Sequence, residues 1–156
     1  MSNGSGQSVV VARFAPADYE NWLPLWRGYQ AFYRTEIPLE TTRVTWSRIM
    51  DPAEPMWGAL ARVGDRTIGM VHWIFHRSNW TIGDYCYLQD LFVDASVRKT
   101  GAGRALIEHV YADARRAGSP RVYWLTHETN ADAIRLYDRV ADRSGFIQYR
   151  KVLPGR

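Results

Sequence analysis

A basic loop with two glycines, followed at once by a helix pattern, is the part of this chain whose residue types most clearly allow chemistry. The loop is Arg98-Lys99-Thr100-Gly101-Ala102-Gly103, and it follows the strand-like run 85–93. The first amide groups of a helix have no intrahelical partner, and the helix dipole favours an anion there by about 0.3–1 kcal/mol. Glycines let the backbone come close to a phosphate. The loop therefore predicts a site for a phosphate-bearing ligand.

Two common phosphate-binding patterns do not fit this loop. The dinucleotide fingerprint requires a third small residue after its two glycines, whereas Arg104-Ala105-Leu106 follows Gly103. The nucleotide-triphosphate loop ends in Gly-Lys-Ser or Gly-Lys-Thr, and this loop does not. A different phosphate-bearing ligand is therefore expected.

The segments around the loop predict a mixed sheet with helices beside it. A helix with an aromatic stripe is expected after Asp18, kinked or divided at Pro24, and Val44, Trp46 and Ile49 should face inward from a second helix. A strand, the loop, a helix and a further strand imply a parallel pairing through a right-handed crossover. The expected strands are 9–14, 56–63, 67–75, 85–93, 121–126 and 146–151, and the remaining expected helices are 40–50, 103–117 and 130–143.

The glycine loop resembles the central motif of the GCN5-related N-acetyltransferase (GNAT) family. That motif reads Q/R-x-x-G-x-G/A at a helix start, and it is Arg98-x-x-Gly101-x-Gly103 in this chain. The resemblance extends through 88–93 and 130–137 to Gly145-Phe146, and the Hpa2-like and polyamine acetyltransferase branches look most similar. It implies an α/β fold whose central mixed sheet has a splayed strand pair.

The resemblance also implies acetyl-coenzyme A as the cofactor and direct transfer of its acetyl group to a primary amine. The pyrophosphate would bind at the loop, and the pantetheine arm would lie along the end of the strand 85–93 as an added strand does. The residues implied to bind the cofactor are Leu91, Phe92, Val93, Arg98, Lys99, Thr100, Gly101, Ala102, Gly103, Arg104, Asn130 and Tyr137.

The group that deprotonates the amine stays open. An alkylammonium has a pKa near 10.4, so neutralising it at pH 7 costs about 4–5 kcal/mol. Similar polyamine enzymes use a glutamate of the central strand, but this chain has Gln89, which cannot act as a base. Gln89 and Asp90 are both candidates, and they face opposite sides of the strand unless a bulge intervenes. The other candidates are Glu36, Asp84, Glu128 and solvent.

The proton donor is predicted more firmly. Asn130, Ile134 and Tyr137 share one helix face by their spacing. Tyr137 matches the family's tyrosine that protonates the departing thiolate, which suits a phenol of pKa near 10. Asn130 either caps the helix or contacts the cofactor.

The amine acceptor is expected at the end of the aromatic first helix. Acidic residues near this mouth suit a polyamine or lysine-like cation in a small molecule or peptide, and the aromatic residues suit an aromatic amine equally well. The residues predicted to line the mouth are Tyr29, Tyr33, Glu36 and Asp84.

Composition restricts the remaining alternatives. With 156 residues and 46% hydrophobic content, the chain suits one domain at 9–156 after a tail at 1–8. A net charge of +4 also permits nucleic acid, but the basic residues are dispersed, so that function is less favoured. A catalytically inactive acyl-CoA-binding module is the other alternative, and the family resemblance makes a homodimer a further expectation.

The cysteine, histidine and apolar content of the sequence argues against disulfide, metal-binding and membrane-spanning functions. The single cysteine, Cys86, excludes an internal disulfide and is expected in the core rather than as a nucleophile. His72 and His76 lack a third ligand, so no metal is expected. Because the sequence has no apolar run of about 18 residues and no signal-peptide pattern, a cytoplasmic protein without membrane attachment is expected.

Overall fold

Five strands pair side by side in the order of the sequence, β1-β2-β3-β4-β5. The computed structural model describes residues 7–97 and 99–155, and the chain divides into an N-terminal unit, 1–125, and a C-terminal unit, 126–156. The first four strands are antiparallel, and β5 is parallel to β4. The strands are β1 (Val9–Arg13), β2 (Met56–Val63), β3 (Arg66–His76), β4 (Tyr85–Val93) and β5 (Val122–Tyr123). This mixed α/β architecture is the predicted fold class.

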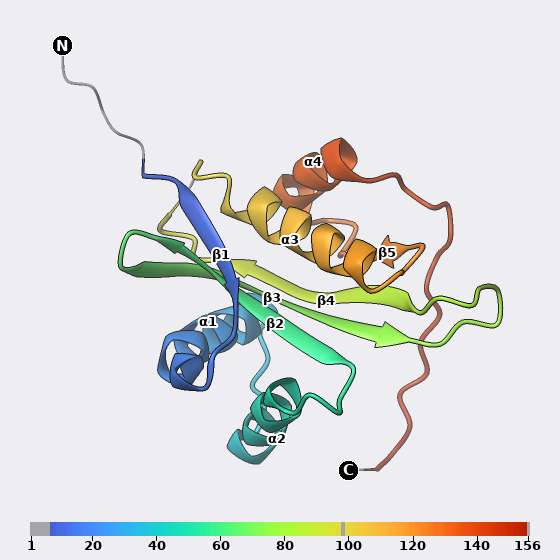
Figure 1. Ribbon diagram of the computed structural model, residues 1–156, viewed down its shortest axis with the longest axis horizontal. Helices are drawn as coiled ribbons and strands as arrows, with labels where there is room; N and C mark the ends of the chain where they lie inside the picture. The colour runs from blue at the N-terminus through green and yellow to red at the C-terminus, as the bar shows by residue number, and fades with distance from the viewer. Residues whose placement is uncertain (1–6, 98, 156) are drawn as a thin grey trace. The chain divides into compact units, whose positions relative to one another are not determined.

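Three helices cover the two faces of this sheet. The helices α1 (Tyr19–Phe32) and α2 (Leu39–Met50) lie on one face, and α3 (Ala102–Arg116) lies on the other (Figure 1). A short 3-10 turn, η1 (Pro16–Asp18), precedes α1. Because α3 carries the chain from β4 back to β5, the two strands can run parallel, as predicted. Gly118, at φ 74°, ends α3 and donates its amide to Arg115.

The aromatic stripe of α1 fills the core between α1, α2 and the sheet. Trp22 is fully buried, and its ring centroid lies 4.9 Å from that of Trp46 on α2 and 5.7 Å from that of Trp26. The helix runs unbroken through Pro24, so the predicted division there is wrong. The burial of this stripe stabilises the helix enough to outweigh one lost backbone hydrogen bond. Val44 was expected to face inward, but it is 42% exposed on α2.

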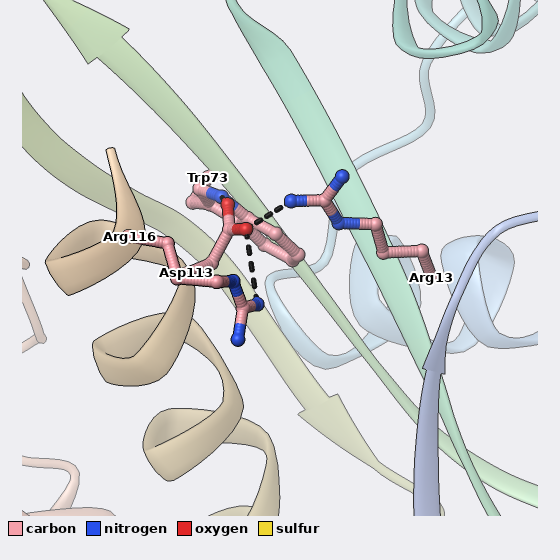
Figure 2. Close-up of polar contacts among 4 residues, drawn as sticks. All are labelled: Arg13, Trp73, Asp113 and Arg116. Atoms are coloured by element: carbon pink, nitrogen blue, oxygen red, sulfur yellow. Dashed lines mark hydrogen bonds and ion pairs between the residues drawn. The ribbon is translucent and has the colours of Figure 1, made fainter.

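The other face of the sheet is closed by α3 and a polar cluster. Asp113 of α3 is buried, and it accepts a hydrogen bond of 2.9 Å from the indole N–H of Trp73 on β3 (Figure 2). Its other carboxylate oxygen pairs with Arg13 of β1 and with Arg116. Since these partners come from β1, β3 and α3, the cluster fixes the helix on the sheet.

The pairing of β3 with β4 contains one β-bulge. His72 lies opposite Asp90, but the next residue, Trp73, lies opposite Leu88. Gln89 is therefore the extra residue of the bulge. Cys86 lies near Asp113 of α3, whereas Phe92 packs with the α1 core, so the bulge changes which residues of β4 face which helix layer.

The C-terminal unit contains one helix, α4 (Ala131–Val140), which is shorter than the predicted 130–143. The predicted strand at 146–151 is wrong, and Phe146, Ile147 and Tyr149 are at least 76% exposed. A strand requires a neighbour for its backbone hydrogen bonds, and this unit supplies none among its described residues. For the same reason the strand expected at 121–126 is confined to β5, the two residues that pair with β4.

The described residues contain neither a membrane-spanning helix nor a cluster of side chains placed to bind a metal ion. Within 7–97 and 99–155, none of the helices combines the length and apolar character needed to cross a bilayer. The same residues contain no group of three or more His, Cys, Asp or Glu side chains placed to hold a metal ion.

Candidate functional site

The glycine loop forms a backbone concavity at the start of α3. Lys99 and Gly101 both adopt left-handed conformations, with φ 58° and 77°, and Gly101 is the residue that precedes the helix. The hydroxyl of Thr100 accepts a hydrogen bond of 3.3 Å from the amide of Ala102. The next two amides of the helix, those of Gly103 and Arg104, have no intrahelical acceptor by their position. The loop therefore presents N–H groups of the kind that bind phosphate oxygens.

Space above the loop is open where a phosphate would approach. A Cβ atom built on Gly101 would meet no heavy atom within 4 Å. Lys99 and Arg104 are exposed, and Arg104 makes only a long contact of 3.9 Å with Glu108. Both cations can therefore turn toward an anion, and the residues present fit a pyrophosphate. Arg98, the first residue of the motif, lies outside the described residues.

Replacing Gly101 with valine is expected to raise the KM for a phosphate-bearing cofactor at least tenfold. A β-branched residue is strained at φ 77°, and its side chain would occupy the open space above the loop. The KM measured against cofactor concentration tests this. Gly118→Val is the matched control, because Gly118 has φ 74° and the same open surroundings but lies at the other end of α3. An equal rise in KM for both variants would contradict a role for the loop.

One edge of β4 is unpaired next to this loop. The pairing of β4 with β5 covers Cys86 with Val122 and Tyr87 with Tyr123. From Leu88 to Val93 no strand is paired to that edge in the part of the chain that the structure describes. The edge includes the predicted cofactor residues Leu91, Phe92 and Val93, and it leaves backbone groups that an extended ligand can meet as a strand would.

Asp90 faces the α1 layer because of the bulge. Its carboxylate Oδ2 lies 2.9 Å from Nδ1 of His72, whose Nε2 accepts a hydrogen bond of 2.9 Å from the indole N–H of Trp22. Burial raises the pKa of the Tyr29 hydroxyl, and this side chain also lies close enough to Asp90 for the carboxylate charge to raise that pKa further. Counting by twos from Cys86 would place Asp90 toward α3, so the bulge brings it to the opposite side. Gln89, in the bulge itself, is exposed.

The Asp90 carboxylate is nearly buried, with 13% of its side chain exposed. Burial, followed by the negative charge of Asp90, raises the pKa of Tyr29. The same two causes, in the same order, raise the pKa of Tyr87. Among the described residues no lysine or arginine forms an ion pair with Asp90. The carboxylate is thus surrounded by neutral donors and by tyrosine rings.

The other residues predicted at the acceptor mouth are only partly brought together. The ring of Tyr33 lies 5.0 Å from that of Tyr29, so both belong near Asp90. Glu36 is exposed in the loop after α1, whose Ile37 amide is held by the buried side chain of Gln30 at 2.7 Å. Asp84 pairs instead with Arg77 at 3.2 Å and lines a cavity of about 510 Å³ with Asp113 and Arg116 of α3. The structure does not bring Asp84 to Asp90.

Asn130 and Tyr137 lie in the C-terminal unit. Asn130 precedes α4, and its side chain makes no capping hydrogen bond with the helix. Its side-chain amide is 3.5 Å from the hydroxyl of Thr126 instead. Tyr137 is half-buried on α4, seven residues further on. Their assigned roles remain predictions.

The family model described as acetyltransferase (GNAT) family matches residues 20–141. The chain belongs to the GNAT family. This match includes the β-bulge, the glycine loop, α4 and all but the first residue of α1, and it begins after β1.

Two curated relatives of this GNAT chain are named for the amines that they acetylate. The D-amino-acid N-acetyltransferase HPA3 of Saccharomyces cerevisiae (strain ATCC 204508 / S288c) is 39% identical over 146 residues, which are 92% of this chain and 90% of the yeast protein. The thialysine N-epsilon-acetyltransferase of Caenorhabditis elegans is 32% identical over 83 residues, 53% of this chain and 51% of that protein.

A solved structure of similar fold contains a coenzyme A derivative. AAC(6')-Iy, in complex with the bisubstrate analogue CoA-S-monomethyl-acetylneamine, superposes with a TM-score of 0.73 at 17% identity. The superposition covers 95% of this GNAT chain and 97% of the other. At that identity the likeness concerns the fold.

Sequence reasoning missed two residues beside Asp90 in this GNAT site. From the sequence, His72 is treated only in relation to metal binding, and Trp22 is one residue of the aromatic stripe that is predicted after Asp18. A histidine within the apolar run Ile68-Gly69-Met70-Val71-His72-Trp73 was a usable signal, because a buried imidazole requires partners for its nitrogens.

Proposed function

We propose that this GNAT chain is an acetyl-CoA-dependent N-acetyltransferase, formed by residues 9–156, which moves the acetyl group directly to a primary amine of a small molecule or peptide. The main support for the proposal is the position of the unpaired edge of β4. The unpaired edge of β4, residues 88–93, includes Asp90 with its nearly buried carboxylate, and it continues through residues 94–97 into the glycine loop. A single stretch of six residues, 88–93, thus connects a surface for an amine with a surface for a pyrophosphate.

The residues of the loop and of β4 would hold the cofactor. Amides of Gly103 and Arg104 and the side chain of Lys99 would bind the pyrophosphate, while the backbone of Leu91 and Val93 would bind the pantetheine amides. When bound, acetyl-CoA supplies an acetyl thioester and a thiol leaving group. The CoA analogue in the structurally similar protein supports this assignment.

Asp90, rather than Gln89, would bind the ammonium group of the acceptor and take its proton. A carboxylate can bind an ammonium ion and then accept its proton, and the site must accomplish both because the free amine is scarce at pH 7. Gln89 has no titratable group and lies in the bulge, exposed. The names of both curated relatives, one for D-amino acids and one for the N-epsilon position of thialysine, support an amine acceptor of this kind.

Direct transfer is favoured over an acyl-enzyme. Cys86, the only cysteine of the sequence, is fully buried, and burial raises the pKa of its thiol to about 12. The thiolate is therefore scarce at neutral pH, and no substrate reaches it. The amine must then attack the thioester itself.

Replacing Tyr137 with phenylalanine is expected to lower kcat by about 10²-fold or more, because the departing thiolate loses its proton donor. The KM for acetyl-CoA should change little. Steady-state kinetics at saturating amine measure both quantities. Tyr149→Phe is the matched control, since Tyr149 is 90% exposed in the same unit. An unchanged kcat for Tyr137→Phe would show that solvent or another group protonates the thiolate.

The proposed function is tested by release of free thiol from acetyl-CoA in the presence of amines. D-amino acids, thialysine, a linear diamine and an aromatic amine cover the acceptor chemistries that the site and the relatives suggest. Thiol release that depends on one of these amines is expected. Binding of acetyl-CoA without amine-dependent release for any acceptor would favour an inactive acyl-CoA-binding module. A homodimer and a cytoplasmic location stay predictions.

A further inference from the structure

We infer that a hydrogen-bonded relay from Trp22 through His72 fixes the Asp90 carboxylate for the ammonium group of the acceptor, so that His72 is a positioning residue and not the base. The inference rests on the proposed function, because it assigns Asp90 to the amine of that reaction. It adds two residues, on α1 and β3, to a site otherwise formed by β4.

The direction of the relay follows from donor and acceptor chemistry. The indole N–H of Trp22 can only donate, so Nε2 of His72 must accept and carries no proton in this arrangement. A neutral imidazole has one N–H, which is then on Nδ1. Nδ1 lies 2.9 Å from Oδ2 of Asp90 and donates to it. The hydrogen bond from Trp22 therefore fixes the tautomer of His72, and the Nδ1–H of that tautomer fixes which oxygen of Asp90 accepts.

The surroundings of His72 leave the imidazole no second role. Its side chain is 5% exposed, and the rings of Phe14, Trp22 and Trp26 lie within 5.9 Å of its centroid. A proton added to Nε2 would face the N–H of Trp22 and break that hydrogen bond. In this arrangement His72 faces Asp90 through Nδ1 and Trp22 through Nε2, and the rings around it separate it from solvent.

Asp90 is left with the properties of a cation site. Its Oδ2 accepts from His72, and the Tyr29 side chain lies close by. The donor on His72 does not use all the lone pairs of a carboxylate. Buried carboxylates are usually paired with a cation, and no lysine or arginine of the described chain is paired with this one.

Two variants of His72 separate this relay from a purely structural role. The side-chain amide of asparagine can occupy the place of Nδ1, so His72→Asn keeps a donor to Asp90 but leaves the buried N–H of Trp22 unsatisfied. The longer glutamine reaches the place of Nε2, so His72→Gln keeps an acceptor for Trp22 but leaves Asp90 without its donor. The two substitutions therefore remove opposite halves of the relay.

The relay predicts that the two His72 variants rank in opposite orders for catalytic activity and for thermal stability. For His72→Gln, kcat/KM for the amine should fall about 10- to 100-fold, the range of one hydrogen bond to a charged group, with an unchanged KM for acetyl-CoA. His72→Asn should lose less than about fivefold of kcat/KM, although its Tm should be the lower of the two because Trp22 is unsatisfied. If His72 only serves Trp22 in the core, the less stable asparagine variant is also the less active one, and the relay is overturned.

A measurement on the wild-type protein tests the relay without any substitution that threatens folding. Nitrogen-15 NMR of the histidine rings distinguishes an imidazole protonated on Nδ1 from one protonated on Nε2, and the variant spectra assign the signals of His72. Protonation on Nδ1 is expected, and protonation on Nε2 would overturn the relay whether or not the protein is active. An inactive wild type would refute the proposed function, whereas an active wild type with the reverse variant order would refute the relay alone.

Discussion

Replacing Asp90 with asparagine is expected to lower kcat/KM for the amine by about 10²- to 10⁴-fold, the range that general-base catalysis contributes. The neutral amide cannot pair with an ammonium ion and cannot take its proton. It would also face the Nδ1–H donor of His72 with a group that is half donor. The KM for acetyl-CoA should stay within about twofold, because the glycine loop is unchanged.

Steady-state kinetics with each substrate varied in turn measure this effect. Gln89→Ala provides the contrast. Gln89 is the neighbouring residue of β4, and it occupies the position at which similar polyamine enzymes have their glutamate base. Asp51→Asn, at the exposed end of α2, controls for the loss of one negative charge. If Gln89→Ala lowers kcat/KM more than Asp90→Asn does, the assignment to Asp90 is wrong.

Replacing Asp113 with alanine is expected to lower the free energy of unfolding by about 2–4 kcal/mol. The indole N–H of Trp73, a fully buried residue, would lose its acceptor. Arg13 would lose the carboxylate that holds it, although its guanidinium also lies 4.4 Å from the centroid of the Trp57 ring. The helix α3 would then lose the polar cluster that ties it to β1 and β3 (Figure 2).

Urea unfolding followed by tryptophan fluorescence gives the free energy for this comparison. Arg116→Ala is the matched control on the same helix, since its side chain is 63% exposed, and exposed ion pairs contribute at most about 1 kcal/mol. A loss below about 1 kcal/mol for Asp113→Ala would mean that water replaces the carboxylate at Trp73.

Much of the N-terminal unit could be predicted from local patterns. The strands β2 and β4 have the predicted bounds, because mainly apolar runs there stop at Gly64-Asp65 and at Asp94. The glycine loop was located because glycine and threonine at a helix start have a specific backbone function. These signals depend only on residues that are close together in the sequence, so the sequence alone is enough to detect them.

The features that were missed depend on contacts between distant segments. Nothing within the run 85–93 indicates that Gln89 is an extra residue, because a bulge is defined by the partner strand. The acceptance of Pro24 within α1 depends on the burial of Trp22 and Trp26 against the sheet. The apolar residues of 146–151 suggested a strand, but strand formation depends on a neighbour that the sequence pattern does not contain.

The bulge shifts the phase of β4 by one residue, and this matters for matching the strand to its relatives. Before Gln89, even-numbered residues such as Cys86 face α3; after it, even-numbered residues such as Phe92 face α1. An alignment anchored at Tyr85 and one anchored at the glycine loop therefore assign different residues to the sheet face that contains Asp90. Counting backward from Gly101 keeps Asp90 and Phe92 on the α1 face. Deleting Gln89 would leave Leu88 opposite Trp73 and Asp90 opposite His72 in a regular ladder, so Asp90 would keep its face while the two flanking motifs come one residue closer in sequence.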